Sequence, residues 1–281
     1  MGQERFGANP SPDAGLVRTF RLAPGAAALA AGARDPSGVP CALIEAEQAD
    51  PSRELARSRS TDTALVPVAG VGLVVRKRWR WTRLRERLKG VGRTTALAAS
   101  PAEREFAALA RTYATGAFHP EPLAFVVARR RGLVASCTLF LTPVPDAIDL
   151  ATWLRDTHDA ALRRRVLADL ARRTRAMHDA HVLDGEHHLR NVLVDGARTW
   201  KVDCPKAREL VRLAPPRAAH DLGCADVGLA RFASRAERLR ALRAYVGETA
   251  PRSTLRAWVE RVRRARARVD ARESRRLPAT T

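Results

Sequence analysis

Two carboxylates and one amide stand at fixed spacing in the second half of this sequence. Glu186 precedes Asn191 by five positions, and Asp203 follows Asn191 by twelve. In protein-kinase-like enzymes the motif H-R-D-x-x-x-x-N, followed by D-F-G, has a similar spacing, with the first acid beside the attacking hydroxyl and the later residues on magnesium. The pattern therefore predicts phosphoryl transfer, with Glu186 in the position of the base and Asn191 and Asp203 as catalytic residues that bind Mg²⁺.

Two residue types differ from that motif although the spacing is kept. Glu186 stands where the motif has Asp, and Asp184 stands where it has His. The extra methylene of Glu displaces the carboxylate by about 1 Å, a misplacement that can cost ~10²-fold in rate. Such a loss equals roughly 3 kcal/mol of barrier. Two hypotheses follow: a slowed enzyme, or a pseudokinase that serves as a nucleotide-binding or regulatory module.

The segment around these residues has the signature of a β-hairpin. Residues 192–194 and 199–202 are strand-like and flank an Asp-Gly turn. In this register Asn191 pairs with Val202 and Asp203 comes next, so two oxygen donors meet at one end of the hairpin, as a magnesium site requires. The alternative is that the Asn caps a turn and the Asp ends a strand, each satisfied locally.

Histidines and acids are concentrated in the same stretch and raise the alternative of a zinc site. The side chains concerned are His178, His181, Asp184, Glu186, His187 and His188. The stretch has no H-E-x-x-H pattern and no cysteine at short range. We therefore take zinc as the minor alternative, and expect one packed histidine and one polar loop histidine at His187 and His188.

A basic residue at the end of a strand is the candidate for binding ATP phosphates. Residues 64–68 and 73–75 are strand-like and are separated by a Gly-containing turn. Lys77 follows the second strand, as the lysine of V-A-I-K does. Arg76 and Arg78 are its competitors, and strand alternation places them together on the opposite face. We predict Lys77 as the phosphate-binding cation; the alternative is a solvated basic face.

A helix begins shortly afterwards and carries a candidate partner for this lysine. Ser100, Pro101 and Glu103 have the types expected at N-cap, N1 and N3. Glu105 lies beside the apolar stripe of the same helix and is predicted to pair with Lys77. The alternative is that Glu105 is a surface acid on a surface helix.

The order of the elements predicts the fold class. A hairpin, a helix, two strands at residues 123–128 and 132–141, a Pro-interrupted connector, a long helix at residues 162–181, the acidic loop, a short hairpin and further helices follow one another. Strands first and helices afterwards indicate an α+β chain in two lobes, a small β-rich N-lobe and a mainly helical C-lobe. The expected division is a partly loose N-terminal extension (residues 1–50), the N-lobe (51–143), the C-lobe (144–270) and a flexible tail (271–281).

The composition indicates anionic partners. The formal net charge is +20, and most of the cations are arginines. Such a field attracts phosphate-bearing substrates, nucleotides, anionic lipid surfaces and nucleic acid. Nine cations in residues 76–93 and ten in residues 252–276 keep a basic nucleic-acid-binding protein as a further alternative, although no recognised nucleic-acid motif accompanies them. The same charge suits peripheral contact with an anionic membrane surface.

Other features of the sequence bear on its compartment. The four cysteines form no CxxC pair, so we expect reduced and mostly buried thiols. No apolar signal segment stands near the start, and no run of eighteen apolar residues occurs. We therefore expect a cytoplasmic protein, with peripheral contact at the inner face of the membrane.

At these residues the chain resembles the Kdo/WaaP-type (InaA-like) lipopolysaccharide kinase family, which has a protein-kinase-like fold. The motifs that carry the resemblance are Lys77-Arg78-Trp79, Arg104-Glu105-Phe106, His188-Leu189-Arg190-Asn191-Val192-Leu193-Val194 and Asp203-Cys204-Pro205. A likeness to the family's C-terminal half continues through His220-Asp221-Leu222. No Gly-rich phosphate loop is visible; residues 58–63, rich in hydroxyl side chains, stand in its place.

The resemblance implies ATP-dependent phosphorylation of a sugar hydroxyl in a lipopolysaccharide core or related glycolipid, with ATP and Mg²⁺ as cofactors. By position, Lys77 would hold the phosphates, Glu105 would orient Lys77, and Asp221 would anchor the catalytic loop. The catalytic residues implied are Glu186, Lys77, Asn191 and Asp203. The cofactor-binding residues implied are Lys77, Glu105, Thr142 and Val144.

Overall fold

The computed structural model describes residues 16–30, 33–35, 38–57, 61–80, 99–114, 116, 120–204 and 206–275. The chain divides into two compact units. The sheet unit comprises Met1–Glu103 and Leu123–Phe140, and the helical unit comprises Arg104–Pro122 and Leu141–Thr281.

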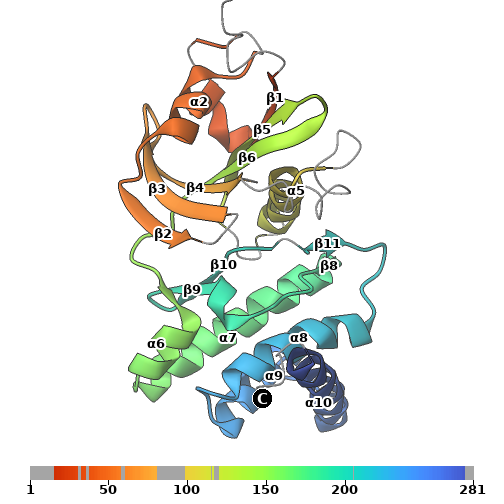
Figure 1. Cartoon of the computed structure of the whole chain (residues 1–281). Helices are drawn as coiled ribbons and strands as arrows, with labels where there is room; N and C mark the ends of the chain where they lie inside the picture. Colours follow the sequence, from red (N-terminus) through yellow and green to blue (C-terminus); the bar gives the residue numbers. More distant parts are fainter. Residues whose placement is uncertain are drawn as a thin grey trace, which may run out of the picture. The chain divides into compact units, whose positions relative to one another are not determined.

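The sheet unit contains a six-stranded sheet with the order β1-β5-β6-β4-β3-β2 (Figure 1). Its strands are β1 (Leu16–Leu22), β2 (Arg53–Arg57), β3 (Thr61–Val68), β4 (Gly72–Arg80), β5 (Pro122–Arg130) and β6 (Leu133–Leu141). Three short helical segments accompany them: η1 (Pro24–Ala26), α1 (Ala27–Ala30) and α2 (Cys41–Gln48). The antiparallel hairpin β3–β4 runs in continuous register from Thr61 opposite Trp79 to Val68 opposite Gly72.

The core of the sheet unit lies where α2 packs against β3 and β4. Along β3, Ala64, Val66 and Val68 are buried at alternate positions, which is the period of a strand with one face covered. Val66 and Val74 from the two strands and Leu43 from α2 belong to one apolar cluster. The helix therefore covers the apolar face that the strand pattern requires.

Helix α5 (Pro101–Ala114) begins with the capping box that the sequence predicts. The backbone amide of Ser100 donates to Glu103 Oε2 at 2.5 Å, and the amide of Glu103 donates to Ser100 Oγ at 3.2 Å. These bonds satisfy two amides that a helix start leaves without a backbone partner. Arg129 also donates to Glu103 Oε2, at 3.0 Å, so the cap is fixed to β5.

The helical unit consists of five further helices and several short strands. The helices are α6 (Leu150–Asp156), α7 (Ala160–Asp179), α8 (Pro215–Leu229), α9 (Arg235–Val246) and α10 (Arg252–Ser274), and the 3-10 helix is η2 (Leu189–Asn191). The strands are β7 (Ile148–Asp149), β8 (Val182–Leu183), β9 (Val192–Asp195), β10 (Arg198–Lys201) and β11 (Arg208–Glu209). Helix α7 contacts β10 and α9, which lie on different sides of it (Figure 1).

Helix α7 is the centre of this unit. Asp159 caps its start by accepting from the amides of Ala161 and Leu162 at 2.8 and 3.1 Å. Its buried stripe includes Val166 and Met177, which pack in an apolar cluster with residues of α6 and of the β9 strand. The stripe follows the helical period, so the sequence pattern alone fixes which face of α7 turns inward.

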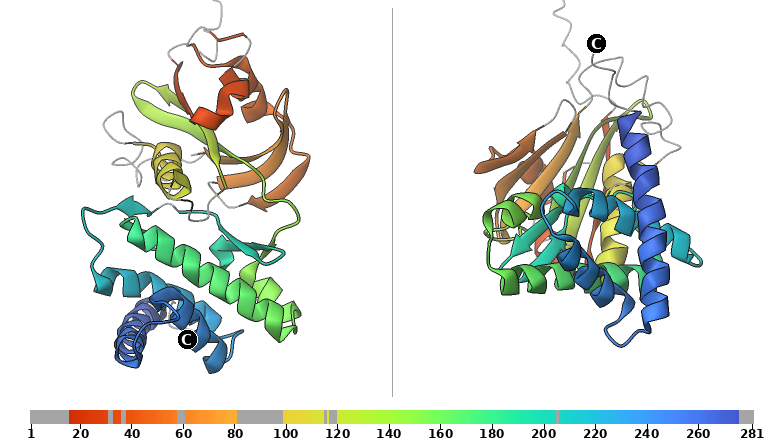
Figure 2. Two further views of the ribbon diagram at one scale, coloured as in Figure 1. Left: turned by 180° about the vertical axis from the view of Figure 1, so that it is seen from behind. Right: turned by 90° about the horizontal axis from the view of Figure 1, so that it is seen from below.

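Helix α10, the dark-blue helix in Figure 2, packs against α8 and also contacts α9. The approach depends on Gly223 of α8. A Cβ at that position would lie 2.8 Å from the backbone nitrogen of Arg266 and 2.9 Å from Ala265 Cβ. The absence of a side chain at Gly223 therefore permits the two helices to pack backbone to backbone.

The α+β fold with strands first and helices afterwards is confirmed, as are both hairpins, the two strands after α5 and the long helix α7. The four cysteines are free thiols, and Cys137, Cys204 and Cys224 are buried, as expected. Within the described ranges no helix combines the length and apolar character that crossing a bilayer demands. Residues 58–60, part of the segment in place of a Gly-rich loop, and Pro205 lie outside the described residues.

Candidate active site

The β9–β10 hairpin brings Asn191 and Asp203 together. Lys201 pairs with Val192 in the ladder, and the amide of Val202 donates to the carbonyl of Asn191 at 2.8 Å, which is the predicted register. The side-chain nitrogen Nδ2 of Asn191 then donates to the carbonyl of Asp203 at 3.4 Å. The amide and the acid that the sequence singles out are therefore neighbours at the open end of one hairpin.

Asp203 has an uncommon backbone conformation. Its φ is +61°, in the left-handed region that non-glycine residues rarely adopt. Two donors hold its carbonyl oxygen, Asn191 Nδ2 and Lys201 Nζ, each at 3.4 Å. A strained backbone held from two sides is typical of positions where a side chain must be aimed at a ligand.

The donor chemistry of this pair fits magnesium. The nitrogen of the Asn191 amide is directed to the Asp203 carbonyl, so Oδ1 is the amide atom left to accept a cation. Asp203 supplies a carboxylate beside it. Magnesium prefers oxygen ligands and takes few of them from protein, with phosphates and water completing the shell.

A buried ion pair lies directly behind these residues. Lys201 Nζ is 3.0 Å from Asp184 Oδ2, and neither side chain is exposed. Within the described residues Asp184 Oδ1 is buried with no hydrogen-bond partner. Asp184 opens the loop of residues 184–191, which holds the predicted catalytic residues Glu186 and Asn191 and is called the catalytic loop below. Lys201 ends the strand before Asp203. The pair therefore joins the loop that contains Glu186 to the strand that precedes Asp203, a candidate metal ligand.

The electrostatics of this pair follow from burial and proximity. Burial alone would raise the pKa of Asp184, but the positive charge of Lys201 and a hydrogen bond from His187 bring that pKa below its ordinary value. Burial would lower the pKa of Lys201, and the charge and hydrogen bond of the neighbouring Asp184 carboxylate instead raise it. Because burial raises the pKa of the Cys204 thiol well above its usual range, Asp184 carries the compensating negative charge at neutral pH.

The sequence gives little indication that Lys201 and Asp184 form an ion pair. Lys201 is not among the predicted site residues, and Asp184 is named only in the position of the motif His and as a possible zinc ligand. The burial is seen only in the folded strand, where Thr199 and Lys201 are buried and the residues between and before them are not. A lysine on the inward face of a strand requires a buried acid, but the sequence does not say which one.

His187 extends the network from the catalytic loop to α7. Its Nδ1 lies 3.0 Å from Asp184 Oδ2, and its Nε2 lies 3.1 Å from Thr174 Oγ1. Thr174 Oγ1 also donates to the carbonyl of Leu170 at 2.8 Å. His187 is 1% exposed, which makes it the packed histidine of the predicted pair.

Asp221 of α8 holds the start of the catalytic loop. Its Oδ2 accepts from the amide of Asp184 at 2.8 Å, and its Oδ1 accepts from the amide of Gly185 at 2.9 Å. His178 Nε2 lies 3.2 Å from Oδ2, and Tyr245 Oη lies 2.8 Å from His178 Nδ1. This is the anchoring arrangement that the family resemblance implies for Asp221.

Glu186 is the most accessible of the acids in the loop. Its side chain is 28% exposed and forms an ion pair with Lys206, which is 53% exposed. Gly185, with a φ of +76°, makes the turn that brings the loop against Lys206. The sequence did not predict Lys206 as a partner of Glu186, because the two residues meet only through the folded loop.

In the sheet unit, both competitors of Lys77 have structural roles. Arg76 is 2% exposed, and its Nη1 donates to three carbonyls at the end of α2, those of Ala46, Glu47 and Ala49, at 3.1, 3.0 and 2.6 Å. This guanidinium caps the last turn of the helix. Arg78 Nε donates to Asp62 Oδ2 at 3.1 Å. Lys77 Nζ lies 5.0 Å from the Trp79 ring, on the other strand face.

The remaining predicted cofactor residues belong to the helical unit. Glu105 is 1% exposed, so the alternative of a surface acid is wrong. Its negative charge contributes to the raised pKa of the Cys204 thiol, and Cys204 follows Asp203 in the sequence. Thr142 Oγ1 accepts from the amide of Glu121 at 2.9 Å, and Val144 is half-buried. The side chain of Thr142 therefore fixes the strand end before the connector.

The zinc alternative finds no support in the geometry. Among the residues that the structure describes, no three His, Cys, Asp or Glu side chains gather as a metal site would require. The imidazoles of His178 and His187 instead form hydrogen bonds within the anchoring network.

Comparison with known proteins decides the family. The model of the lipopolysaccharide kinase (Kdo/WaaP) family matches residues 43–223, a span that contains the β3–β4 hairpin, the catalytic loop and Asp221. The chain belongs to this family. The fold class and the family resemblance inferred from the sequence are thereby confirmed.

A solved structure of this kinase family shows the same fold. The structure described as "WaaP in complex with acyl carrier protein" matches with a TM-score of 0.59 and 19% identity, covering 88% of this chain and 98% of that chain. At this level of identity the likeness concerns the fold alone. None of the curated proteins searched matches the sequence.

Proposed function

We propose that this member of the lipopolysaccharide kinase family transfers the γ-phosphate of ATP to a sugar hydroxyl of a lipopolysaccharide core or related glycolipid. The observation that carries the proposal is the pairing of Asn191 with Asp203 at the end of the β9–β10 hairpin. The strained backbone of Asp203 and the buried ion pair behind it support the same conclusion.

The chain's own residues supply three functions that phosphoryl transfer needs. Asn191 and Asp203 would hold Mg²⁺, which when bound neutralises charge on the transferred phosphate. Glu186 would stand near the attacking hydroxyl and accept its proton. Lys77, oriented by Glu105, would bind the phosphates, and the structural roles of Arg76 and Arg78 leave Lys77 as the best candidate on its strand.

One observation favours a second candidate function. The Glu186 carboxylate, already one methylene longer than the Asp of the motif, is paired with Lys206. A carboxylate held in an ion pair with an ammonium group is less available to contact a substrate hydroxyl. A pseudokinase that binds nucleotide and acts as a regulatory module is therefore the alternative.

The cations of the C-terminal helix support peripheral contact with an anionic membrane surface. Arg252, Arg256, Arg261, Arg264 and Arg268 are exposed on α10. Basic side chains that lie near an anionic bilayer surface each contribute roughly 1 kcal/mol of attraction to it. Such contact would bring the enzyme to a lipid-linked acceptor on the cytoplasmic side.

The test is ATP consumption by the purified full-length protein against a panel of core sugars, with Mg²⁺. We expect turnover that is lost in Asp203→Asn and reduced about 10²–10⁴-fold in Glu186→Gln, the range for loss of a general base. Glu186→Asp should keep or raise the rate. Magnesium-dependent nucleotide binding without turnover, and without recovery in Glu186→Asp, would instead establish the pseudokinase.

A further inference from the structure

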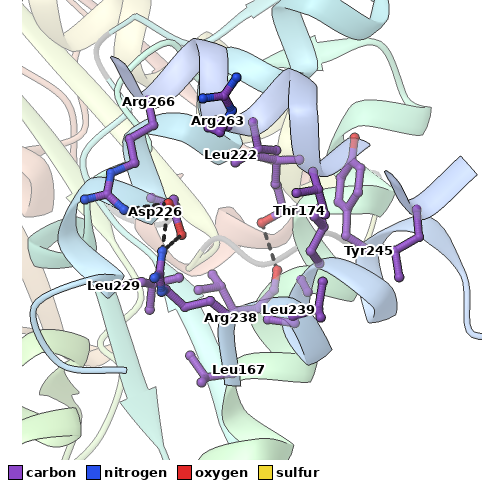
Figure 3. A pocket seen from close by; sticks show the side chains of 18 of the residues that line it. Leu167, Thr174, Leu222, Asp226, Leu229, Arg238, Leu239, Tyr245, Arg263 and Arg266 are labelled. Atoms are coloured by element: carbon purple, nitrogen blue, oxygen red, sulfur yellow. Dashed lines mark hydrogen bonds and ion pairs between the residues drawn. The ribbon is translucent and has the colours of Figure 1, made fainter. Parts of the chain in front are cut away.

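A cavity of about 590 Å³ lies among four helices of the helical unit (Figure 3). Helices α7, α8, α9 and α10 all contribute to its wall. Its volume is within the range of small-molecule binding sites, roughly 300–1,000 Å³. The space is partly open to solvent, so a ligand can reach it from outside.

The wall of the cavity is apolar. The aliphatic side chains that line it include Leu167, Leu170, Leu222, Leu229, Leu242 and Val262. A sugar or a nucleotide base would lose its hydrogen bonds to water there without gaining partners, at several kcal/mol for each polar group. An aliphatic chain loses nothing by the same transfer and gains roughly 0.8 kcal/mol for each methylene removed from water.

The rim of the cavity is cationic. Five arginines (Arg235, Arg238, Arg256, Arg263 and Arg266) outnumber the two carboxylates, Asp226 and Glu260. Arg238 and Arg266 share Asp226, and Arg263 pairs with Glu260. Arg235 and Arg256 are exposed and form no ion pair with any described residue. The rim therefore keeps positive charge that its own acids do not compensate.

One rim arginine also has an unused donor. The Nη1 atom of Arg238 is bound to Asp226 at 2.8 and 3.0 Å, whereas its Nε is buried and has no hydrogen-bond partner in the described part of the chain. Buried donors of this kind are rarely left unsatisfied in a native structure. Because the atom is closed to solvent, a ligand headgroup would meet the exposed guanidinium groups of Arg235 and Arg256 instead.

We propose that this cavity binds an amphiphile with a single aliphatic chain and an anionic headgroup. The chain lies along the leucine wall between α7 and α8, and the headgroup meets the guanidinium groups of the rim. The site takes a carboxylate or a phosphate monoester headgroup by the same chemistry, since guanidinium binds both. Binding here does not depend on the proposed phosphotransferase activity.

The test is calorimetric titration of the full-length protein, below the critical micelle concentration, with myristate and with 1-myristoyl lysophosphatidate. We expect one molecule bound per chain for at least one of them, and a preference between the two that identifies the headgroup. A maltoside with the same chain length should bind at least about tenfold more weakly, because it lacks the charge that the rim attracts. Absence of saturable binding of both anionic probes would overturn the proposal.

Three variants separate the cavity from general attraction to a basic surface. Arg235→Glu/Arg256→Glu reverses the uncompensated rim charges and should weaken binding at least about tenfold. Arg240→Glu/Arg252→Glu is the matched control, since both are exposed arginines of α9 and α10 outside the lining. Ala225→Phe places a ring in the cavity and should abolish binding. Equal losses in the two charge-reversed proteins, or unchanged affinity in Ala225→Phe of normal circular dichroism, would contradict the proposal.

Discussion

The catalytic loop and the apolar cavity belong to the same helical unit and meet at His187 of the loop and its partner Thr174, which both line the cavity, yet they are built in opposite ways. Behind the loop, charged groups are fully buried and paired, with Lys201 on Asp184 and Asp221 on two loop amides. In the cavity, leucines surround an open space. Paired charges have one acceptable arrangement and fix a geometry, whereas an apolar wall accepts any chain that fills it.

Removing one member of the buried Lys201–Asp184 pair should have the largest effect on the free energy of unfolding. Lys201→Met leaves the Asp184 carboxylate buried without its cation, and we expect a loss of about 3–5 kcal/mol in the free energy of unfolding. Urea denaturation of the full-length protein measures it. The double variant Asp184→Leu/Lys201→Met should recover most of that stability, because replacing both charges removes the desolvation penalty. A double variant as unstable as the single one would show that packing, not charge, explains the effect.

The pH dependence of stability provides a sharper test of the same pair. The pKa of Asp184 is lowered in the folded state, so its contribution is present above its unfolded pKa of about 3.9 and is lost as pH falls through the folded pKa. The pKa of Lys201 is raised, so its contribution is present below about 10.4 and is lost as pH rises through the folded value. The stability difference between wild type and Asp184→Leu/Lys201→Met, in which neither position titrates, should therefore stay constant from pH 5 to 9, and wild type should lose stability relative to this variant below about pH 4. A difference that changes near neutral pH would indicate another titrating group.

The two glycines of α8 test the packing of the two regions: Gly223 lies against α10, beside the cavity, and Gly228 lies against Leu189 of the catalytic loop. Gly223→Ala places a methyl group against the backbone of α10, which cannot yield without moving the cavity wall, and we expect about 1–3 kcal/mol of destabilisation. Gly228→Ala meets only the side chain of Leu189, at 2.7 Å, which can rotate away, so its effect should be smaller. Thermal denaturation of both variants makes the comparison. A larger loss for Gly228→Ala would mean that the catalytic loop packs more rigidly than the α8–α10 interface.

Substitution of Thr174, which lines the cavity and contacts His187, should have the smallest effect on the free energy of unfolding. Thr174→Val keeps the volume of the side chain but removes the hydroxyl that meets His187 Nε2 and the Leu170 carbonyl. We expect about 1 kcal/mol from the His187 contact, because the bond of a helical Thr to the carbonyl four residues back contributes little to stability. If the two regions are separate, myristate affinity will be unchanged in this variant while turnover falls. A change in both would show that occupancy of the cavity and the state of the loop are linked.

What the sequence predicts well here is governed by local chemistry. The Ser100–Glu103 capping box, the β9–β10 hairpin and the stripe of α7 depend on residues a few positions apart, and all three are confirmed. The Asn191–Asp203 pairing followed from the hairpin register in the same way. The roles of Asn191, Asp203, Glu186 and Lys77 in catalysis remain predictions.

What the sequence could not reveal depends on contacts between distant segments. Strand alternation puts Arg76 and Arg78 on one face. It does not show that the carbonyls at the end of α2 lie where the Arg76 guanidinium can bind them. Lys201 and Asp184 are seventeen positions apart and meet only after the loop folds back. The cavity is lined by residues of α7, α8, α9 and α10, and the periodicity of no single helix predicts it.

The most direct test of the proposed active site is binding of a divalent ion by Asn191 and Asp203. Manganese, a paramagnetic substitute for magnesium, can be titrated by electron paramagnetic resonance in the presence of a non-hydrolysable ATP analogue. We predict one tightly bound ion, lost in Asp203→Asn and weakened in Asn191→Ala. Asp195→Asn, at the exposed turn of the same hairpin, should bind it normally. Unchanged manganese affinity in Asp203→Asn would contradict the proposed site.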